Sequence, residues 1–419
     1  MSYLEIQGGK RLHGELTVHG AKNSVLPLLA AAYMCEGQTI LHNCPLLSDV
    51  NVSVKILEHL GCKCEWQGNT VTITSSNSGV YEIPENLMRE MRSSVVFLGA
   101  VATKLGKGEM CLPGGCELGP RPIDIHIESL QKLGADIDCC SGCLNCVFNN
   151  GVMGAVLHLR FPSVGATENI ILAATLGNGT TVIHNAAKEP EIEDLASFLN
   201  KAGAKISGAG SDTVIIEGVN RLSGVEYTVM PDRIIAATCM LATAACNGKV
   251  HLINAVPQHI MPVISVLKDG GCEVNVNDGG LTVVSHIRQR NFNTVSTQPY
   301  PGFPTDAGPI LVAMSSVSRG TGVFVENIFN SRFHYVDELK RLGADIKTVG
   351  RVAVISGVRV LEGAEVVSHD LRGGAALTVA ALAAKGKSVV RKPCFIDRGY
   401  EKIEDIFGVL GAEIKRIEE

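Results

Sequence analysis

The stretch Leu57-Glu58-His59-Leu60-Gly61-Cys62 is the first of six similar phrases whose spacing predicts the fold. In each phrase an apolar residue stands four positions before a glycine, and alanine or cysteine follows that glycine. The glycines recur every 68 to 73 residues, at Gly61, Gly134, Gly203, Gly271, Gly343 and Gly411. A constant period of this length is typical of a repeated supersecondary unit. We predict that each glycine is the left-handed C-terminal cap of an amphipathic helix.

A second marker runs in step with the first. An alanine-rich apolar segment ends at a glycine, and a short β-like run follows. These glycines are Gly37, Gly108, Gly179, Gly248, Gly320 and Gly386. Each unit is therefore predicted as buried helix, glycine turn, strand, amphipathic helix, glycine cap and strand. The first helix, as in residues 25–34 and 375–384, is apolar nearly all round and should be buried.

Six such units in 419 residues predict an α/β fold of two domains with three units each. Buried helices should lie inside each domain, with sheets around them. The period alone leaves the domain boundary open.

Composition excludes several classes of protein. The net charge is −5, so a nucleic-acid partner held by bulk electrostatics is not expected. No run of 18 apolar residues lacks a charge or a glycine, and the first residues show no export signal, so membrane insertion is not expected. The 14 cysteines are then expected to stay reduced in a cytoplasm.

Basic residues recur at predicted helix starts, where the helix dipole disfavours them by roughly 0.3 to 1 kcal/mol. When an unfavourable placement of this kind recurs and nothing nearby compensates for its cost, it indicates a functional site. Helix starts combined with cations favour a multiply anionic ligand such as phosphate or carboxylate. The residues are Lys22, Arg92, Arg121, Arg233, Arg332, Arg372 and Arg398, and we expect the last two to open both helices of the sixth unit.

Residues 113–122 hold three glycines, three prolines and Cys116, which excludes regular structure. A thiol beside Arg121 and a helix start is a setting for thiolate or acid–base chemistry. The alternative is a surface loop with an incidental cysteine. Asp306 and Asp370 precede buried helices, and the leading interpretation is that both are N-caps. A carboxylate among bound anions could instead act as a general base.

The spacing of Cys139, Cys140, Cys143 and Cys146 resembles a metal cluster. A zinc or iron–sulfur site usually needs a second group of ligands, and Ser141-Gly142 favours a β-turn. We therefore predict neither a metal nor a cofactor.

Several motifs together resemble the UDP-N-acetylglucosamine 1-carboxyvinyltransferase (MurA enolpyruvyl transferase) family. They run in order along nearly the whole chain: Gly-Ala-Lys22-Asn23, Met-Arg92-Ser-Ser, Leu-Pro-Gly-Gly-Cys116-x-x-Gly-x-Arg121-Pro, Pro-Ser163-Val-Gly-Ala-Thr167, Glu189-Pro-Glu191-Ile, Pro-Asp232-Arg233-Ile, Phe-Pro-Thr-Asp306, Asp370-Leu-Arg372 and Asp397-Arg398-Gly-Tyr-Glu. The Cys116 loop is absent in this form from the related 3-phosphoshikimate enzymes. The resemblance implies two inside-out α/β barrels of three repeats each, over residues 22–229 and over 1–21 plus 230–419.

The reaction that this family implies moves the enolpyruvyl group of phosphoenolpyruvate to the 3'-hydroxyl of UDP-N-acetylglucosamine and releases phosphate, the first committed step of peptidoglycan precursor synthesis. Addition and elimination at one carbon need an acid and a base in one site, with cations around the phosphate and carboxylate.

The resemblance also implies residue roles. Cys116 is the general acid at carbon 3, able to form a covalent adduct, and Asp306 is the base for the sugar hydroxyl. Phosphoenolpyruvate is held by Lys22, Asn23, Arg121, Arg332, Arg372 and Arg398, with Asp370 in support, and Asn23 also contacts the sugar. UDP-N-acetylglucosamine is bound by Arg92, Arg121, Pro122, Ile123, Asp124, Ile125, Ser163, Val164, Asp306 and Ile328.

This chain departs from the family pattern near Asp306. Many relatives carry glutamate where Ile235 stands, and glutamines where residues 307–310 read Ala-Gly-Pro-Ile, while Ser48 replaces a lysine of some members. These departures leave one alternative open, a weakly active or non-catalytic paralogue that binds UDP-N-acetylglucosamine. A competing enzyme of the same fold is a 3-phosphoshikimate enolpyruvyl transferase.

Overall fold

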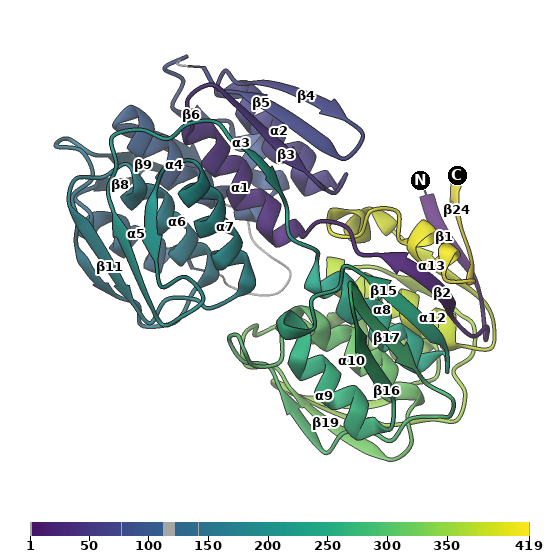
Figure 1. Cartoon of the computed structure of the whole chain (residues 1–419). Helices are drawn as coiled ribbons and strands as arrows, with labels where there is room; N and C mark the ends of the chain where they lie inside the picture. The colour runs from purple at the N-terminus through teal and green to yellow at the C-terminus, as the bar shows by residue number, and fades with distance from the viewer. Residues whose placement is uncertain (1, 77, 112–121, 141, 419) are drawn as a thin grey trace. The chain divides into compact units, whose positions relative to one another are not determined.

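A computed structural model describes residues 2–76, 78–111, 122–140 and 142–418, with the backbone alone for Arg92 and Cys140 (Figure 1). The chain forms two compact units. Among the described residues, the central unit comprises 20–111 and 122–230. The terminal unit comprises Met1–His19 and Pro231–Glu419, and thus contains both chain ends.

Three buried helices pack against one another in the central unit. They are α1 (Lys22–Met34), α4 (Val96–Leu105) and α6 (Val164–Thr175). Twelve of the 13 residues of α1 are buried, which confirms the prediction that this helix is buried. The outer helices are α2 (Ser48–His59), α5 (Asp124–Lys132) and α7 (Pro190–Lys201), with the short α3 (Glu85–Glu90) and η1 (Arg92–Val95).

Three four-stranded sheets surround these helices, in the orders β14-β3-β5-β4, β6-β7-β9-β8 and β10-β11-β13-β12. Their strands are β3 (Gln38–His42), β4 (Lys63–Gln67), β5 (Thr70–Thr74), β6 (Glu82–Ile83), β7 (Lys107–Cys111), β8 (Asp136–Cys140), β9 (Cys143–Val147), β10 (Val156–His158), β11 (Thr180–His184), β12 (Lys205–Ser207), β13 (Thr213–Glu217) and β14 (Glu226–Thr228).

The terminal unit repeats this plan, with buried helices α8 (Arg233–Ala245), α10 (Gly308–Val317) and α12 (Leu371–Ala383). Its outer helices are α9 (Met261–Gly270), α11 (Tyr335–Arg341) and α13 (Ile403–Val409). Short 3-10 turns are η2 (Pro257–Ile260), η3 (Thr305–Ala307), η4 (Arg332–His334) and η5 (Pro393–Arg398).

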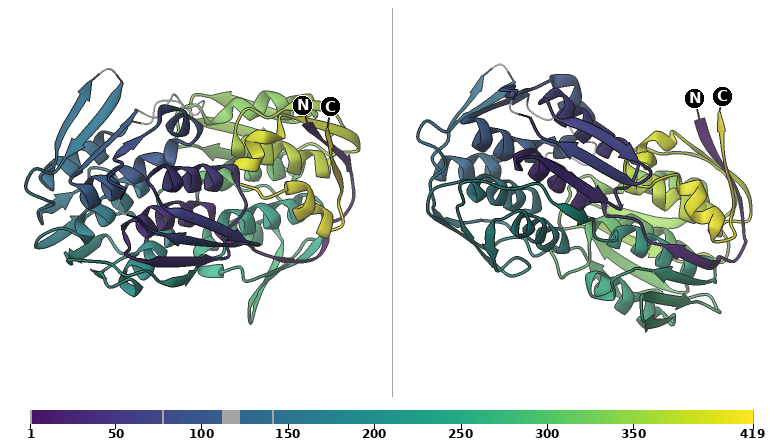
Figure 2. Two further views of the ribbon diagram at one scale, coloured as in Figure 1. Left: turned by 90° about the horizontal axis from the view of Figure 1, so that it is seen from above. Right: turned by 45° about the horizontal axis from the view of Figure 1, so that its top comes forward.

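The sheets of the terminal unit have the orders β16-β17-β15-β2, β18-β19-β21-β20 and β22-β23-β1-β24. Their strands are β1 (Ser2–Gly8), β2 (His13–Thr17), β15 (Lys249–Ile253), β16 (Glu273–Asn277), β17 (Gly280–Val284), β18 (Thr294–Ser296), β19 (Thr321–Val325), β20 (Asp345–Val349), β21 (Val352–Ser356), β22 (Glu365–Val367), β23 (Gly386–Arg391) and β24 (Glu413–Glu418). Because β1 pairs with β24, the two chain ends lie side by side (Figure 2).

The repeat is richer in strands than predicted. Only one strand was expected after each glycine cap, but two paired strands follow it in five repeats, as in β4 and β5, and a short edge strand completes each sheet. The edge strands are too short, at two to three residues in most sheets, to give an alternating pattern. In the sixth repeat the second strand is supplied by β1 from the other end of the chain.

The predicted cap glycines are confirmed. All six, from Gly61 to Gly411, have φ between 83° and 108°, the left-handed region in which glycine carries no Cβ penalty. In the second set, Gly108 and Gly248 do not have this conformation. A Cβ at Gly248 would lie 2.2 Å from the carbonyl oxygen of Leu12, so close backbone approach requires glycine there.

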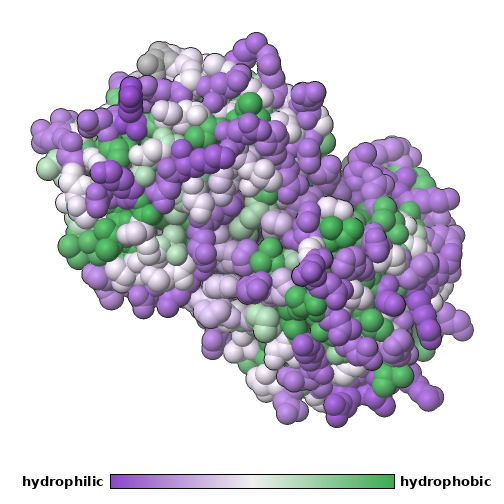
Figure 3. Space-filling view, in the orientation of Figure 1, coloured by the Kyte–Doolittle hydropathy of each residue, from purple (hydrophilic) through white to green (hydrophobic). Residues whose placement is uncertain are grey.

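Each unit has its own hydrophobic core. One core runs from Val25 to Val229, and the other joins Leu4–Val18 to residues between Ile235 and Ile414. On the face shown in Figure 3, hydrophilic residues predominate and hydrophobic residues are scattered among them. Among the described residues, no helix is both long enough and apolar enough to cross a membrane.

Candidate functional site

Asp306 is the centre of a charged cluster in the terminal unit. It lies on η3, just before buried helix α10, and two arginines hold its carboxylate. Arg332 Nη2 donates to Oδ1 at 3.1 Å, while Arg372 donates to Oδ2 from Nε at 3.1 Å and from Nη2 at 2.9 Å. The structure therefore brings together three residues that are far apart in sequence, since Asp306 and Arg372 are separated by 66 positions.

Both arginines are buried while the carboxylate remains partly accessible. The side chains of Arg332 and Arg372 are 2% and 3% exposed, whereas that of Asp306 is 27% exposed. Burial lowers the pKa of Arg372. The negative charge of Asp306, followed by Tyr400 and Asp232, raises it by more, so the pKa of Arg372 lies above its ordinary value. Arg372 is thus a permanent cation at this site.

Two guanidinium nitrogens in this cluster are available for a ligand. Arg332 Nε and Arg372 Nη1 are buried and have no hydrogen-bond partner among the described residues. A buried donor without a partner costs about 1–3 kcal/mol, which an incoming anion would offset. The arrangement is suited to binding a carboxylate or phosphate next to the Asp306 carboxylate.

The two aspartates interpreted as N-caps behave differently. Asp370 caps α12 through Oδ1, which accepts from the backbone N–H groups of Arg372 at 3.0 Å and Gly373 at 2.9 Å, so its N-cap interpretation is confirmed. For Asp306 that interpretation is wrong, because no side-chain hydrogen bond caps η3 or α10 and its oxygens face the arginines. Asp232 caps α8 in the equivalent place of the fourth repeat.

The segments on either side of Asp306 are fixed by buried groups that sequence reasoning missed. Glu326, fully buried at the end of β19, accepts from Thr305 Oγ1 at 2.8 Å and from the backbone N–H of Ile328 at 2.7 Å. Gly308 packs so closely on Phe324 that a Cβ would lie 2.5 Å from the ring. No pattern in the sequence marked Glu326, because its side-chain partners Thr297 and Thr305 lie 29 and 21 positions away in the chain.

The other basic residues of this unit occupy different settings. Arg233 begins α8 as predicted, with its guanidinium 5.7 Å from the centre of the Tyr300 ring. Arg398 was expected to open the outer helix of the sixth unit, and this is wrong: it is the last residue of η5, and α13 begins only at Ile403. It is half-buried there.

In the central unit, Lys22 and Asn23 begin α1 as predicted. Lys22 is 8% exposed, and its Nζ lies 2.7 Å from Oδ2 of the buried Asp49 on α2. Ser24 donates to Asp194 on α7, which also accepts from Tyr227 Oη at 2.7 Å. Asp49 and Asp194 therefore position the helix start that carries Lys22. Sequence reasoning missed both, because each reads as an ordinary residue of an amphipathic helix.

Most of the residues expected to contact UDP-N-acetylglucosamine in this unit lie at the starts of α5 and α6, which pack together. Pro122 is exposed, while Ile123, Asp124 and Ile125 are half-buried. Asp124 and Glu128 both pair with Arg160. Ser163 caps α6, directly before Val164. Cys116 and Arg121 lie outside the described residues, and only the backbone of Arg92, at the start of η1, is described.

A group of buried carboxylates lies between α6 and α7. Glu168, Glu189 and Glu191 are 8%, 9% and 2% exposed. Burial, and then the neighbouring Glu191 and Glu189, raise the pKa of Glu168 well above its ordinary value. Glu189 and Glu191 belong to a motif noted in the sequence, but Glu168 was not predicted.

The cysteine-rich stretch forms the hairpin of β8 and β9, in which Cys140 stands opposite Cys143. Ser141 of the predicted turn lies outside the described residues. In the part of the chain that the structure describes, no three His, Cys, Asp or Glu side chains are arranged to hold a metal ion.

Comparisons with known proteins agree with these features. The family model described as EPSP synthase (3-phosphoshikimate 1-carboxyvinyltransferase) matches residues 6–407. UDP-N-acetylglucosamine 1-carboxyvinyltransferase 2 of Caldanaerobacter subterraneus subsp. tengcongensis is 49% identical, and the match covers 100% of both chains. UDP-N-acetylglucosamine 1-carboxyvinyltransferase of Finegoldia magna is 44% identical over 100% of this chain and 99% of its own.

Solved structures confirm the predicted fold class. The enolpyruvyl transferase NikO from Streptomyces tendae has a TM-score of 0.88 at 23% identity, covering 99% of this chain and 98% of its own. EPSP synthase from Acinetobacter baumannii has a TM-score of 0.75 at 18% identity, with 100% of both chains covered. At these identities the likeness shows the α/β enolpyruvyl transferase fold.

Proposed function

We propose a set of residue roles on the premise that this chain belongs to the UDP-N-acetylglucosamine 1-carboxyvinyltransferase family of enolpyruvyl transferases. The reaction transfers the enolpyruvyl group of phosphoenolpyruvate to the 3'-hydroxyl of UDP-N-acetylglucosamine and releases phosphate. The observation that carries the proposal is the Asp306 carboxylate held by two buried arginines with unused donors.

Asp306 is proposed as the base. Its carboxylate is partly exposed, so a sugar hydroxyl can reach it, and the two arginines hold its oxygens in place. The unused nitrogens of Arg332 and Arg372 are proposed to hold the carboxylate of phosphoenolpyruvate. Asp370 supports this arrangement because its side chain caps the backbone of Arg372.

Cys116 is proposed as the acid that gives a proton to carbon 3 of phosphoenolpyruvate, and then as the group that can bond to carbon 2. In the elimination step, carbon 3 returns a proton and the carbon–oxygen bond to phosphate breaks. Lys22, Arg121 and Arg398 are proposed to bind that phosphate, since the family resemblance implies this role and Lys22 lies at a helix start, which is suited to phosphate. The buried pairing of Lys22 with Asp49 supports a fixed position for its ammonium group.

UDP-N-acetylglucosamine is proposed to be bound by the residues that the family resemblance implies, with Asn23 in contact with its sugar. The half-buried starts of α5 and α6 support a binding surface in the central unit. The full proposed set is Asn23, Arg92, Arg121, Pro122, Ile123, Asp124, Ile125, Ser163, Val164, Asp306 and Ile328. We also propose the domains 22–229 and 1–21 plus 230–419, and a cytoplasmic location for an enzyme of peptidoglycan precursor synthesis.

The test is phosphate release by the purified chain. We expect release that requires both phosphoenolpyruvate and UDP-N-acetylglucosamine. No release at millimolar substrates would overturn the proposal, and release with shikimate 3-phosphate as the acceptor would favour the 3-phosphoshikimate alternative. Tight binding of UDP-N-acetylglucosamine without turnover would identify a non-catalytic paralogue.

The role of Cys116 has its own test. An epoxide phosphonate such as fosfomycin should alkylate this thiol, because the phosphonate mimics the bound phosphate and the epoxide offers an electrophilic carbon to a thiolate. Intact-mass analysis should show one adduct, and peptide mapping should place it on Cys116. An adduct on another cysteine would contradict the assignment.

A further inference from the structure

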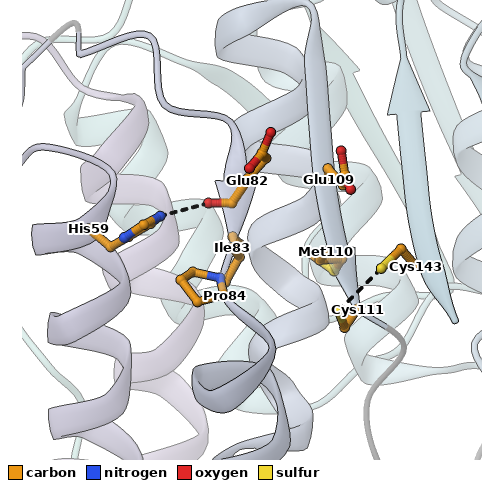
Figure 4. Close-up of a pocket in the computed structure, with 8 residues that line it drawn as sticks. All are labelled: His59, Glu82, Ile83, Pro84, Glu109, Met110, Cys111 and Cys143. Atoms are coloured by element: carbon orange, nitrogen blue, oxygen red, sulfur yellow. Dashed lines mark hydrogen bonds between the residues drawn. The ribbon is translucent and has the colours of Figure 1, made fainter.

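Two thiols face each other across neighbouring strands of the central unit. Cys111 is the last residue of β7 and Cys143 the first of β9, and the antiparallel register pairs them directly. Their sulfur atoms are 3.3 Å apart, as the dashed line in Figure 4 marks. Only Cys143 belonged to the cysteine-rich stretch noted in the sequence. The transferase chemistry uses neither thiol.

The pair opens onto a cavity of about 290 Å³. Both cysteines are half-buried, so a small reagent can reach them from this cavity. The lining residues are His59, Glu82, Ile83, Pro84, Glu109, Met110, Cys111 and Cys143 (Figure 4). None of them belongs to the set of residues proposed for the transferase site.

The strand register of this pair is compatible with a disulfide. Directly opposed residues on antiparallel strands have Cα atoms about 4.5–5.5 Å apart, and disulfides span Cα distances of about 4.4–6.8 Å. A sulfur–sulfur bond is about 2.05 Å long, so the two atoms at 3.3 Å have about 1 Å left to close. Side-chain rotation can supply that movement without a shift of the strands.

The surroundings favour thiol exchange over chelation. Structural metal sites usually need about four ligands, and the His59 ring nitrogen Nε2 is already 3.0 Å from the carbonyl oxygen of Glu82. The hydrogen bond to Cys143, and then burial, raise the pKa of Cys111 to about 11. Cys111 therefore stays largely a protonated thiol near neutral pH.

We propose that Cys111 and Cys143 form a reversible disulfide by exchange with a low-molecular-weight disulfide. The thiolate of one cysteine attacks one sulfur of that reagent, and the reagent's sulfur–sulfur bond breaks to release the first thiol. The thiolate of the other cysteine then attacks the cysteine sulfur of this mixed disulfide, and the second reagent thiol leaves. The two cysteine protons end on the two released thiols, so the cysteines are oxidised as the reagent is reduced.

The experiment equilibrates the full chain in buffers of glutathione and glutathione disulfide from reducing to oxidising ratios, followed by acid quenching, alkylation and tryptic mapping. Cleavage after Lys107, Lys132 and Arg160 places the two cysteines on different peptides. We expect a link between peptides 108–132 and 133–160, assigned by fragmentation to Cys111 and Cys143 and lost on reduction.

Variants provide the control. Cys111→Ser and Cys143→Ser should each reduce the link at least tenfold, whereas the exposed Cys139→Ser should leave it unchanged. A link that persists in Cys111→Ser, and so comes from Cys116, would overturn the proposal. So would wild-type protein that carries only glutathione adducts, or a bond from Cys143 to another cysteine of its own peptide. The wild-type fragmentation result decides the proposal even if a serine variant fails to fold.

Discussion

At the scale of single residues, Asp306 shows how neighbours decide a role. Asp232 and Asp370 occupy equivalent places in other repeats and accept two backbone N–H groups each, as N-caps do. Asp306 instead faces two buried guanidinium groups. An aspartate before a buried helix is therefore a helix cap in two repeats, whereas in a third repeat its carboxylate faces two arginines.

Asp306→Asn keeps a side-chain oxygen for the arginines but cannot take a proton. We expect kcat to fall by about 10²–10⁴, the usual contribution of a positioned base, with a smaller change in KM. Steady-state phosphate release measures this. The matched control is Asp232→Asn, which keeps a good N-cap and should change the free energy of unfolding by only a few tenths of a kcal/mol. A kcat within tenfold of wild type would contradict the role of Asp306.

Glu168 makes stability depend on pH in an unusual direction. Because burial and two neighbouring glutamates raise its pKa in the folded chain, the folded state binds the proton more tightly than the unfolded state. The resulting stabilisation is complete below the unfolded pKa near 4.5 and is lost as pH rises through the raised folded pKa.

Glu168→Gln should remove this dependence, so the variant should gain stability over wild type as pH rises from about 5 to about 8. Urea unfolding at several pH values measures the difference. The exposed Glu217→Gln, in the same unit, should follow wild type at every pH. Parallel curves for wild type and Glu168→Gln would contradict the assignment.

At the scale of helices and strands, glycine is required for two separate reasons. Gly343 has φ of 93° and open space where a Cβ would lie, so only backbone conformation excludes other residues. Gly248 lacks a left-handed φ, but a Cβ there would meet the Leu12 carbonyl oxygen at 2.2 Å. The first reason is local, and the second exists only after residues 12 and 248 have come together.

Gly343→Ala should cost about 1 kcal/mol, the strain of a left-handed alanine. Gly248→Ala should cost more, about 1–3 kcal/mol or above, because backbone atoms must move apart. Urea unfolding of the two variants compares them within one unit. Gly343→Asn is the control for conformational strain and should be milder than Gly343→Ala, since asparagine tolerates this region. A Gly248→Ala variant as stable as Gly343→Ala would refute the close-approach argument.

At the scale of the whole molecule, the two cores make the units separable. The buried residues of one core all fall between Val25 and Val229, while the other core needs both chain ends. Strand pairing agrees with this boundary. The strand β14, near the end of the central unit, pairs with β3 of the same unit, while β2, near the start of the chain, pairs with β15 of the terminal unit.

We therefore expect a fragment of residues 20–230 to fold alone, with a cooperative urea transition and helical circular dichroism. Deletion of residues 1–19 should instead unfold the terminal unit, because it removes β1 from between β23 and β24. Limited proteolysis of the deletion variant should leave a resistant core within residues 20–230. A fragment without a cooperative transition would show that its core depends on the rest of the chain.

The sequence by itself determined the six repeats, the buried helices, the left-handed cap glycines and the reaction class suggested by its motifs. These features depend on residue types at fixed spacings along the chain, so the sequence pattern alone predicts them. Only the tertiary structure decided that Asp306 pairs with Arg332 and Arg372, that Glu326, Asp49 and Asp194 hold the neighbouring segments, and that β1 joins the sixth sheet. Such contacts join residues far apart in the chain, and their partners are selected by packing and charge in three dimensions.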